Sequence, residues 1–325
     1  MKLSILDQSP IRHGGTAHDA VTETIALAQA GEKWGYERFW IAEHHNTNSL
    51  ASSAPEVLLA AVGAHTNSIR LGSGGVMLPH YAAFKVAETF SMLATLYPER
   101  VDLGIGRAPG SDMETARVLA SDGVPKFDRF PQLVQNLRVM LTDRDFRPKV
   151  TPRPPSPPPI WMLGSSPESA NLAGHLGLPY NFALFINNKM SPQIFQYYRT
   201  QFKPSEQLEK PRTILTINVV CAETEEKAKR LAMPRALGFL KFVTKRPVSG
   251  IPTIEEAENF PYTPQETAFI RDRAYQSAVG TPKQVKAKIE QLASAYQADE
   301  IMALTITHDF EDRLRSYELL AEQFM

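Results

Sequence analysis

The sequence predicts an α/β fold, a (β/α)8 TIM barrel formed by a single domain over residues 1–325. Short apolar segments alternate with amphipathic helical patterns along the whole chain, and eight such strands can be counted. A length of 325 residues suits one barrel of this kind. A doubly wound open sheet shows the same alternation and is the alternative. No G-x-G-x-x-G sequence follows the first strand, which weakens a Rossmann interpretation.

The strands are expected where four to nine residues are mostly apolar and end in polar or glycine-rich sequence. In order, they are residues 3–6, 38–42, 69–72, 100–105, 160–164, 180–186, 213–220 and 301–306. Amphipathic periodicity predicts helices at about residues 16–35, 57–65, 83–96, 130–141, 165–176, 281–296 and 313–323. Capping boxes are expected to begin three of them, at Thr16, Ser53 and Thr281.

Two segments interrupt this alternation. Residues 147–159 contain seven prolines and cannot continue a helix or a central strand. They are either a linker between domains or, as we prefer, an excursion over the barrel rim or its closed end. Residues 244–276 have no strong period and many polar residues. We expect them to form a long, partly mobile insertion before the last βα unit.

The composition favours a small-molecule enzyme in the cytoplasm. Lys+Arg and Asp+Glu both number 35, so no overall charge favours nucleic acid or an anionic membrane. The single cysteine, Cys221, can form neither an internal disulfide nor a thiolate zinc site, and we expect no metal. The N-terminus lacks the apolar region of a signal peptide, and no stretch is long and apolar enough to span a membrane.

Three predicted strand ends carry residues suited to chemistry, because a barrel places its functional groups there. Glu43, His44 and His45 follow the second strand and could transfer protons, although a histidine there could also be only a packing residue. The glycines that follow the third strand, Gly74 and Gly75, allow a planar ligand to approach closely, or form a plain turn.

The fourth and fifth strands end in groups that suit a phosphate. Arg107 follows the fourth strand, and Ser165, Ser166 and Ser169 follow the fifth at the start of a helix. A helix N-terminus offers free N–H groups, and an arginine adds a bidentate positive charge. Alternatively, Ser166 only caps the helix and Arg107 forms an ion pair. Glu168 in the first turn competes for the same helix dipole.

Five segments, in this order and spacing, resemble the bacterial luciferase-like flavin-dependent monooxygenases, in particular their single-chain, non-luminescent branch. The segments are residues 40–45 (WIAEHH), 71–79 (LGSGGVMLP), 99–107 (ERVDLGIGR), 163–166 (LGSS) and 279–282 (VGTP). The resemblance runs from the first strand to the last helix. Gly106 stands where true luciferase alpha chains carry a reactive cysteine, so light emission is not expected.

The resemblance implies FMN bound across the barrel mouth. His44 matches a catalytic base or orienting residue, and the turn at Gly74 and Gly75 matches one with a cis peptide beneath the flavin. Glu43 is placed with the cofactor-binding residues. The family's phosphate-binding residues match Arg107, Ser166 and Ser169, with Ser165 beside them; Arg129 is the candidate for a second phosphate arginine. The insertion at residues 244–276 matches a mobile loop over the active site.

The function implied is oxygenation of a small organic substrate by reduced FMN and O2, with the reduced flavin supplied by a separate reductase. A homodimer is the family expectation. Two alternatives stay open: a hydride-transfer enzyme of the same fold that uses deazaflavin F420, and a protein that binds FMN without turnover.

Overall fold

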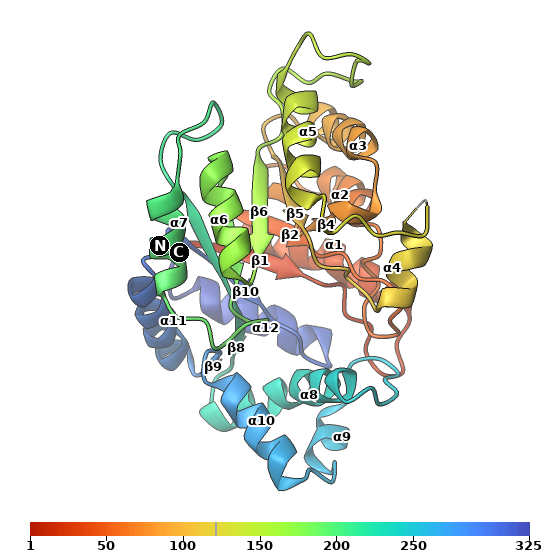
Figure 1. The fold of residues 1–325 in the computed structure, drawn as a ribbon. Coiled ribbons are helices and arrows are strands. Elements are labelled where there is room, and N and C mark those ends of the chain that lie inside the picture. The colour runs from red at the N-terminus through yellow and green to blue at the C-terminus, as the bar shows by residue number, and fades with distance from the viewer. Residues whose placement is uncertain (121) are drawn as a thin grey trace.

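The computed structural model describes residues 1–120 and 122–325, and within them it contains a closed parallel barrel (Figure 1). Eight strands follow one another around it and β8 pairs with β10 to close the ring. They are β1 (Lys2–Asp7), β2 (Arg38–Ile41), β3 (Arg70–Ser73), β5 (Val101–Gly106), β6 (Ile160–Gly164), β7 (Tyr180–Ala183), β8 (Thr213–Cys221) and β10 (Glu300–Leu304). The predicted fold class is confirmed, and closure excludes the open-sheet alternative.

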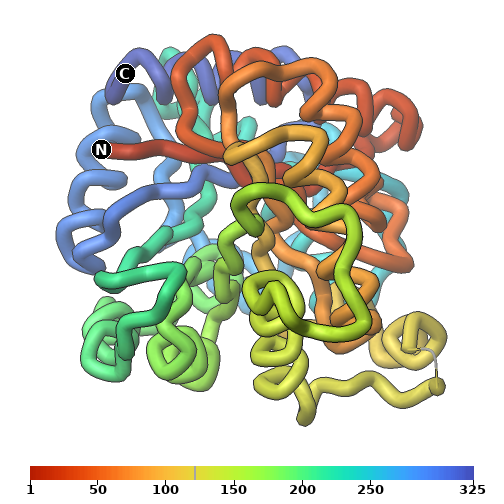
Figure 2. The backbone as a smooth tube through the Cα atoms, turned by 90° about the horizontal axis from the view of Figure 1, so that it is seen from above, coloured from red at the N-terminus to blue at the C-terminus, as the bar shows by residue number. Residues whose placement is uncertain are grey.

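Helices surround the strands, as Figure 1 and Figure 2 show from two directions. They are α1 (Ala17–Lys33), α2 (Pro55–Ala64), α3 (Ala83–Leu96), α4 (Met113–Leu119), α5 (Phe130–Thr142), α6 (Pro167–Leu176), α7 (Gln193–Gln201), α8 (Glu225–Val243), α9 (Ile254–Glu258), α10 (Pro264–Ala274), α11 (Pro282–Tyr296) and α12 (Phe310–Ala321). No helix in the described part of the chain is long and apolar enough to cross a membrane.

The helix α11 illustrates how local sequence directs the outer layer. Thr281 caps its first turn reciprocally with Gln284, and its buried positions recur at the spacing of one helical face. This buried stripe is Val285, Ile289, Leu292 and Tyr296, as predicted. The capping box predicted at Thr16 is confirmed as well.

A buried ionic network fills the amino-terminal end of the barrel. Arg38 donates to Asp102 at 2.5 Å and to Glu300 at 2.6 Å, and all three side chains are about 1% exposed. Removing one member would leave an uncompensated buried charge, which is strongly destabilising. The interior of the barrel is therefore filled at this end, and the cavity described below lies at the carboxyl ends of the strands.

The capping box predicted at Ser53 is wrong. The helix α2 begins at Pro55, its N-cap is Ala54, and no side chain caps it. A box at Ser53 would require Ala54 to be helical, but a residue before proline is driven into extended conformations. Ala54 has ψ 77°, so the helix starts at proline itself, in the first-turn position that proline favours.

The proline-rich residues 147–159 join α5 to β6, two consecutive parts of the same barrel. They form no helix or strand and lie at the amino-terminal end of β6, at the top of Figure 1 and nearest the viewer in Figure 2. Their last carbonyl, at Pro159, accepts a hydrogen bond from the Leu103 N–H on β5. The structure therefore places this segment at the barrel end opposite the strand termini discussed below.

Residues 244–276 contain more regular structure than the sequence pattern indicated. They hold the short helix α9 and the helix α10, each begun by a capping box, at Thr253 and Thr263. Figure 1 shows α8, α9 and α10 together at the carboxyl-terminal end of the barrel. Apolar periodicity did not reveal these helices because they bury few residues. The helix α10 has no fully buried side chain. The sequence also gave no sign of α4 or of the two-residue strand β4 (Val76–Met77).

Candidate active site

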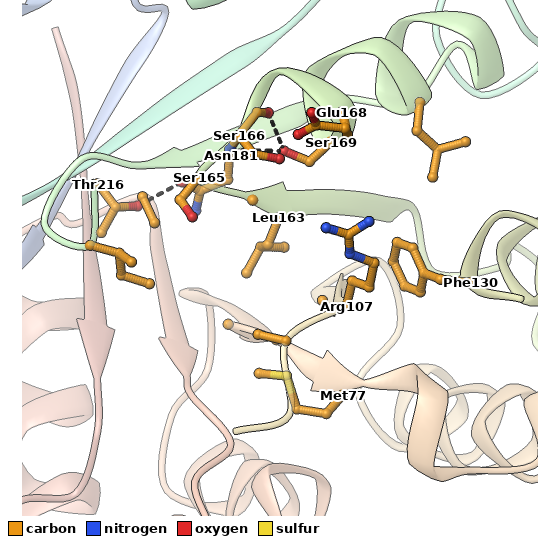
Figure 3. Close-up of a pocket in the computed structure, with 18 of the residues that line it drawn as sticks. Met77, Arg107, Phe130, Leu163, Ser165, Ser166, Glu168, Ser169, Asn181 and Thr216 are labelled. Atoms are coloured by element: carbon orange, nitrogen blue, oxygen red, sulfur yellow. Dashed lines mark hydrogen bonds between the residues drawn. The ribbon is translucent and has the colours of Figure 1, made fainter. Parts of the chain in front are cut away.

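A cavity of about 450 Å³ opens at the carboxyl ends of the strands (Figure 3). Its wall is mostly apolar and is built from segments that follow several different strands. The residues that line it include Leu6, Gly74, Gly75, Met77, Gly106, Arg107, Phe130, Leu163, Ser165, Ser166, Ser169, Asn181, Phe185, Ile186 and Thr216. Six of the nine residues predicted for the site are thus brought together: both glycines, Arg107 and the three serines.

Arg107 and the start of α6 form the polar end of this cavity. Arg107 leaves β5 beside Phe130, and its guanidinium faces Ser169 across the cavity (Figure 3). It forms no ion pair with any side chain that the structure describes. Ser166 is the N-cap of α6, and its hydrogen bond, with help from the charge of Arg107, lowers the pKa of Glu168. A free guanidinium opposite a helix N-terminus suits a phosphate or another anion.

Ser169 is held in place by protein contacts. Its hydroxyl donates to the Ser166 carbonyl at 2.7 Å and lies 3.0 Å from the Tyr180 hydroxyl. A Cβ at Gly164 would lie only 2.0 Å from Ser169 Oγ, so glycine is required for this approach. The turn between β6 and α6 is therefore shaped to present the serines to the cavity.

The turn after β3 has the peptide geometry implied by the resemblance: the bond between Gly74 and Gly75 is cis. Both glycines line the cavity. A Cβ at Gly75 would lie 2.9 Å from the Gly104 carbonyl oxygen and 3.1 Å from Leu163. A side chain at Gly75 would therefore collide with β5, and the bare backbone forms a flat part of the wall.

Glu43 lies outside the cavity wall and supports it from behind. Its buried carboxylate accepts hydrogen bonds from the Met77 N–H at 3.0 Å and from the Tyr81 hydroxyl at 2.7 Å. His45 Nε2 lies 2.8 Å from the same carboxylate. Glu43 thereby ties the end of β2 to the segment that follows the glycine turn. Direct cofactor contact by Glu43 stays a prediction, whereas its support of Met77 is observed.

His44 and His45 have different surroundings. His44 is partly exposed, but its Nδ1 is enclosed and has no hydrogen-bond partner among the described residues. Burial lowers the pKa of His44 to about 4, so its imidazole is neutral at pH 7. His45 is instead engaged with Glu43. His44 is not part of the cavity wall itself, and its catalytic role stays a prediction.

Arg129 does not reach the cavity. It is exposed at the N-cap of α5, while the next residues, Phe130 and Pro131, line the wall. The structure thus shows one arginine in the cavity, Arg107, and a second nearby on the surface.

The family assignment follows from comparison with known proteins. Residues 1–298 match the model of the luciferase-like monooxygenase family. The chain belongs to the luciferase-like monooxygenase family.

Curated relatives match nearly the full length of this chain. YwcH of Bacillus subtilis is 44% identical over 100% of this chain and 99% of its own. An Escherichia coli K12 protein described as a luciferase-like monooxygenase is 39% identical over 97% and 95%. The N-acetyl-S-alkylcysteine monooxygenase of B. subtilis is 36% identical over 99% and 98%.

Solved structures of similar proteins agree with the barrel of this chain. Apo-MsnO8 superposes with a TM-score of 0.93, at 38% identity, over 99% of this chain and 98% of its own. The oxygenating constituent of 3,6-diketocamphane monooxygenase, solved with FMN, has a TM-score of 0.72 at 18% identity, over 99% and 97%, and supports the fold alone.

Two polar residues of the cavity were not predicted from the sequence. Thr216 on β8 donates to the side-chain oxygen of Asn181 on β7 at 2.7 Å, and both line the cavity although they are almost fully buried. Buried parallel strands are usually continuous apolar runs. A polar residue within such an apolar run was therefore the one feature of the sequence that could have indicated these cavity-lining positions.

Proposed function

We propose that this protein is an FMN-dependent monooxygenase that oxygenates a small organic substrate with reduced FMN and O2. One observation carries the proposal: Arg107 faces the start of α6 at one end of a cavity whose remaining wall is largely apolar. FMN has the matching parts, an anionic phosphate and a planar ring system. The named activity of the B. subtilis N-acetyl-S-alkylcysteine monooxygenase, 36% identical to this chain, favours oxygenation as the reaction.

The residues fit FMN in both chemistry and space. Arg107 and the hydroxyl and N–H groups at the start of α6 would hold the phosphate. The flat backbone at Gly74 and Gly75 would lie against the ring, because no side chain fits at Gly75. Bound FMN, once reduced, would supply the two electrons that the reaction of O2 requires. The protein would orient the reactants and exclude water.

His44 would handle protons during this reaction. Its imidazole is neutral at pH 7, because burial lowers its pKa, so a ring nitrogen is free to take up a proton transiently and release it again. The apolar residues Met77, Leu163 and Phe185 would keep water away from the reacting atoms.

The decisive assay is substrate-dependent O2 consumption with chemically reduced FMN, using N-acetyl-S-alkylcysteines as first substrates. We expect consumption to be coupled to an oxygenated product. Transfer of hydride to or from F420, with no oxygenated product, would support the F420 alternative. Tight FMN binding without turnover of thioethers, aldehydes or sulfonates would support the other alternative, a protein that binds FMN without catalysis.

The proposal also includes two partners. Reduced FMN would come from a separate reductase, so this chain with NADH or NADPH alone should not reduce FMN. A homodimer would bury apolar side chains that α2 and α3 leave exposed, among them Val57 at 67%, Met92 at 49% and Leu96 at 54%. Sedimentation analysis of the wild type and of Met92→Glu tests the dimer: the variant should sediment as a monomer.

A further inference from the structure

Two neighbouring arginines at the carboxyl-terminal end of the barrel, Arg235 and Arg273, have no acidic partner among the described residues. Arg235 lies on α8 and Arg273 on α10. Neither forms a salt bridge with a carboxylate anywhere in residues 1–120 or 122–325. Other arginines nearby are paired: Arg230 with Glu258 and Arg246 with Glu266. The unpaired Arg235 and Arg273 therefore contrast with these two paired arginines.

Arg273 lies directly behind the cavity wall. Its Nη2 donates to the carbonyl oxygen of Phe185 at 2.6 Å and lies 3.4 Å from that of Ile186. Phe185 and Ile186 both line the cavity. The Arg273 guanidinium also lies 4.1 Å from the centroid of the Phe239 ring on α8. Arg273 thus joins the cavity wall to one particular face of α8.

Arg235 lies on that same face, one helical turn before Phe239. Its Nε is enclosed and has no hydrogen-bond partner within the described chain. Burial lowers the pKa of Arg235 to about 10, and the charge of Arg273 adds to this effect. Arg235 is still charged at pH 7. The residue as a whole is partly exposed, and the enclosed group without a partner is its Nε–H. An enclosed N–H without an acceptor is costly, and an anionic ligand would remove the cost by supplying the missing charge and acceptor.

A further unsatisfied polar atom faces the barrel mouth. Thr216 lines the cavity, and Asn218 lies two residues later on β8, so both side chains point to the same side of the strand. The Asn218 side-chain oxygen is enclosed and accepts no hydrogen bond in the described structure. Within the described chain, Arg235 Nε thus lacks an acceptor and Asn218 Oδ1 lacks a donor.

We propose that Arg235 and Arg273 form a subsite for the carboxylate of the substrate, between the cavity wall at Phe185 and Ile186 and the helix α8. The inference rests on the proposed function, since it concerns the substrate of that same site. The substrates would then be small organic carboxylates whose apolar part packs against Leu163 and Phe185 in the cavity. Arg107 would hold the cofactor phosphate, so the two anionic groups are recognised by separate arginines.

The test compares two probes that differ only in charge, N-acetyl-S-benzylcysteine and its carboxamide. Their dissociation constants are measured by calorimetry on the FMN-loaded protein. We expect the carboxylate to bind at least about tenfold more tightly, the usual worth of a charge-assisted hydrogen bond. Arg235→Gln should abolish this preference, and Arg235→Lys should restore part of it.

Arg230→Gln is the matched control, because Arg230 lies on the same helix but is already paired with Glu258. It should keep the preference for the carboxylate. Equal affinities of the two probes, no binding of the carboxylate, or a preference that survives in folded Arg235→Gln would overturn the inference. FMN binding is measured separately: its absence would count against the proposed function, whereas FMN binding without carboxylate preference would count against this subsite alone.

Discussion

The carboxylate of Glu43 accepts a hydrogen bond from the backbone N–H of Met77 at 3.0 Å. This contact joins the end of β2 to β4, immediately after the glycine turn of the cavity wall. The same carboxylate accepts from the Tyr81 hydroxyl. Glu43 is therefore a positioning residue: it fixes the backbone against which a planar cofactor would lie.

We expect Glu43→Gln to lower both stability and FMN affinity. An amide cannot accept hydrogen bonds from all of these donors, and each buried donor left unsatisfied costs about 1–3 kcal/mol. Urea denaturation and FMN titration measure the two effects. Glu255→Gln, at an exposed position on α9, is the control and should change neither. Unchanged values for Glu43→Gln would remove the positioning role.

His44→Ala should lower coupled turnover by about 10²–10⁴, the usual contribution of general acid–base catalysis, while FMN affinity stays within a few-fold. His45 provides the control variant, because its ring contacts the Glu43 carboxylate and the ring of His44 does not. His45→Ala should act mainly on stability. Steady-state O2 consumption and product formation measure the result. Normal coupled turnover in His44→Ala would show that the histidine only packs.

His44 should also contribute to acid sensitivity of the folded protein. Its pKa is lowered from 6.5 to about 4 by burial. Between these values the unfolded chain binds a proton that the folded chain does not, so stability falls as the pH falls through this window. His44→Gln should therefore lose less stability between pH 7 and pH 4.5, by about 2–3 kcal/mol.

Urea denaturation of the apo protein at the two pH values measures this difference. His18→Gln, at an exposed position, is the control and should follow the wild type. An equal loss of stability in His44→Gln and the wild type would contradict the assignment of a buried, neutral imidazole.

Limited subtilisin digestion tests whether the insertion moves. Residues 244–250 connect α8 to the rest of the insertion and are largely exposed, including Lys245 and Arg246. We expect the first cut there rather than in α10, whose capping box and Arg273 contacts hold it to the barrel. FMN together with substrate should slow this cut. A first cut in residues 147–159, unaffected by ligand, would contradict a mobile segment over the site.

Much of the fold could be predicted because local signals and packing agree. The stripe of α11 and its Thr281 cap are both visible in sequence, and the barrel strands are apolar runs. The helix α10 could not be predicted by periodicity, because it packs through few residues. The start of α2 was misplaced because the effect of Pro55 on its neighbour overrides a favourable Ser53.

The cavity was predicted better than its supporting contacts. Residues that follow adjacent strands, such as Arg107 and Ser166, must meet once a barrel is assumed. The bonds of Glu43 to Met77 and Tyr81 join residues 34 and 38 positions apart, and no pattern in the sequence signals them. The approach of Arg273 on α10 to the face of α8 that carries Arg235 likewise depends on how α10 folds back.

The most direct test of the account is the affinity of this protein for FMN compared with riboflavin, measured by fluorescence titration. Arg107 and the start of α6 recognise a phosphate in this account, so FMN should bind much more tightly than riboflavin. Arg107→Ala should weaken FMN binding by about 1.5–3 kcal/mol, the usual range for a hydrogen bond to a charged group, and leave riboflavin unchanged. Arg117→Ala, on α4 outside the cavity, should leave both affinities unchanged. Equal affinities of the wild type for FMN and riboflavin would contradict the central claim.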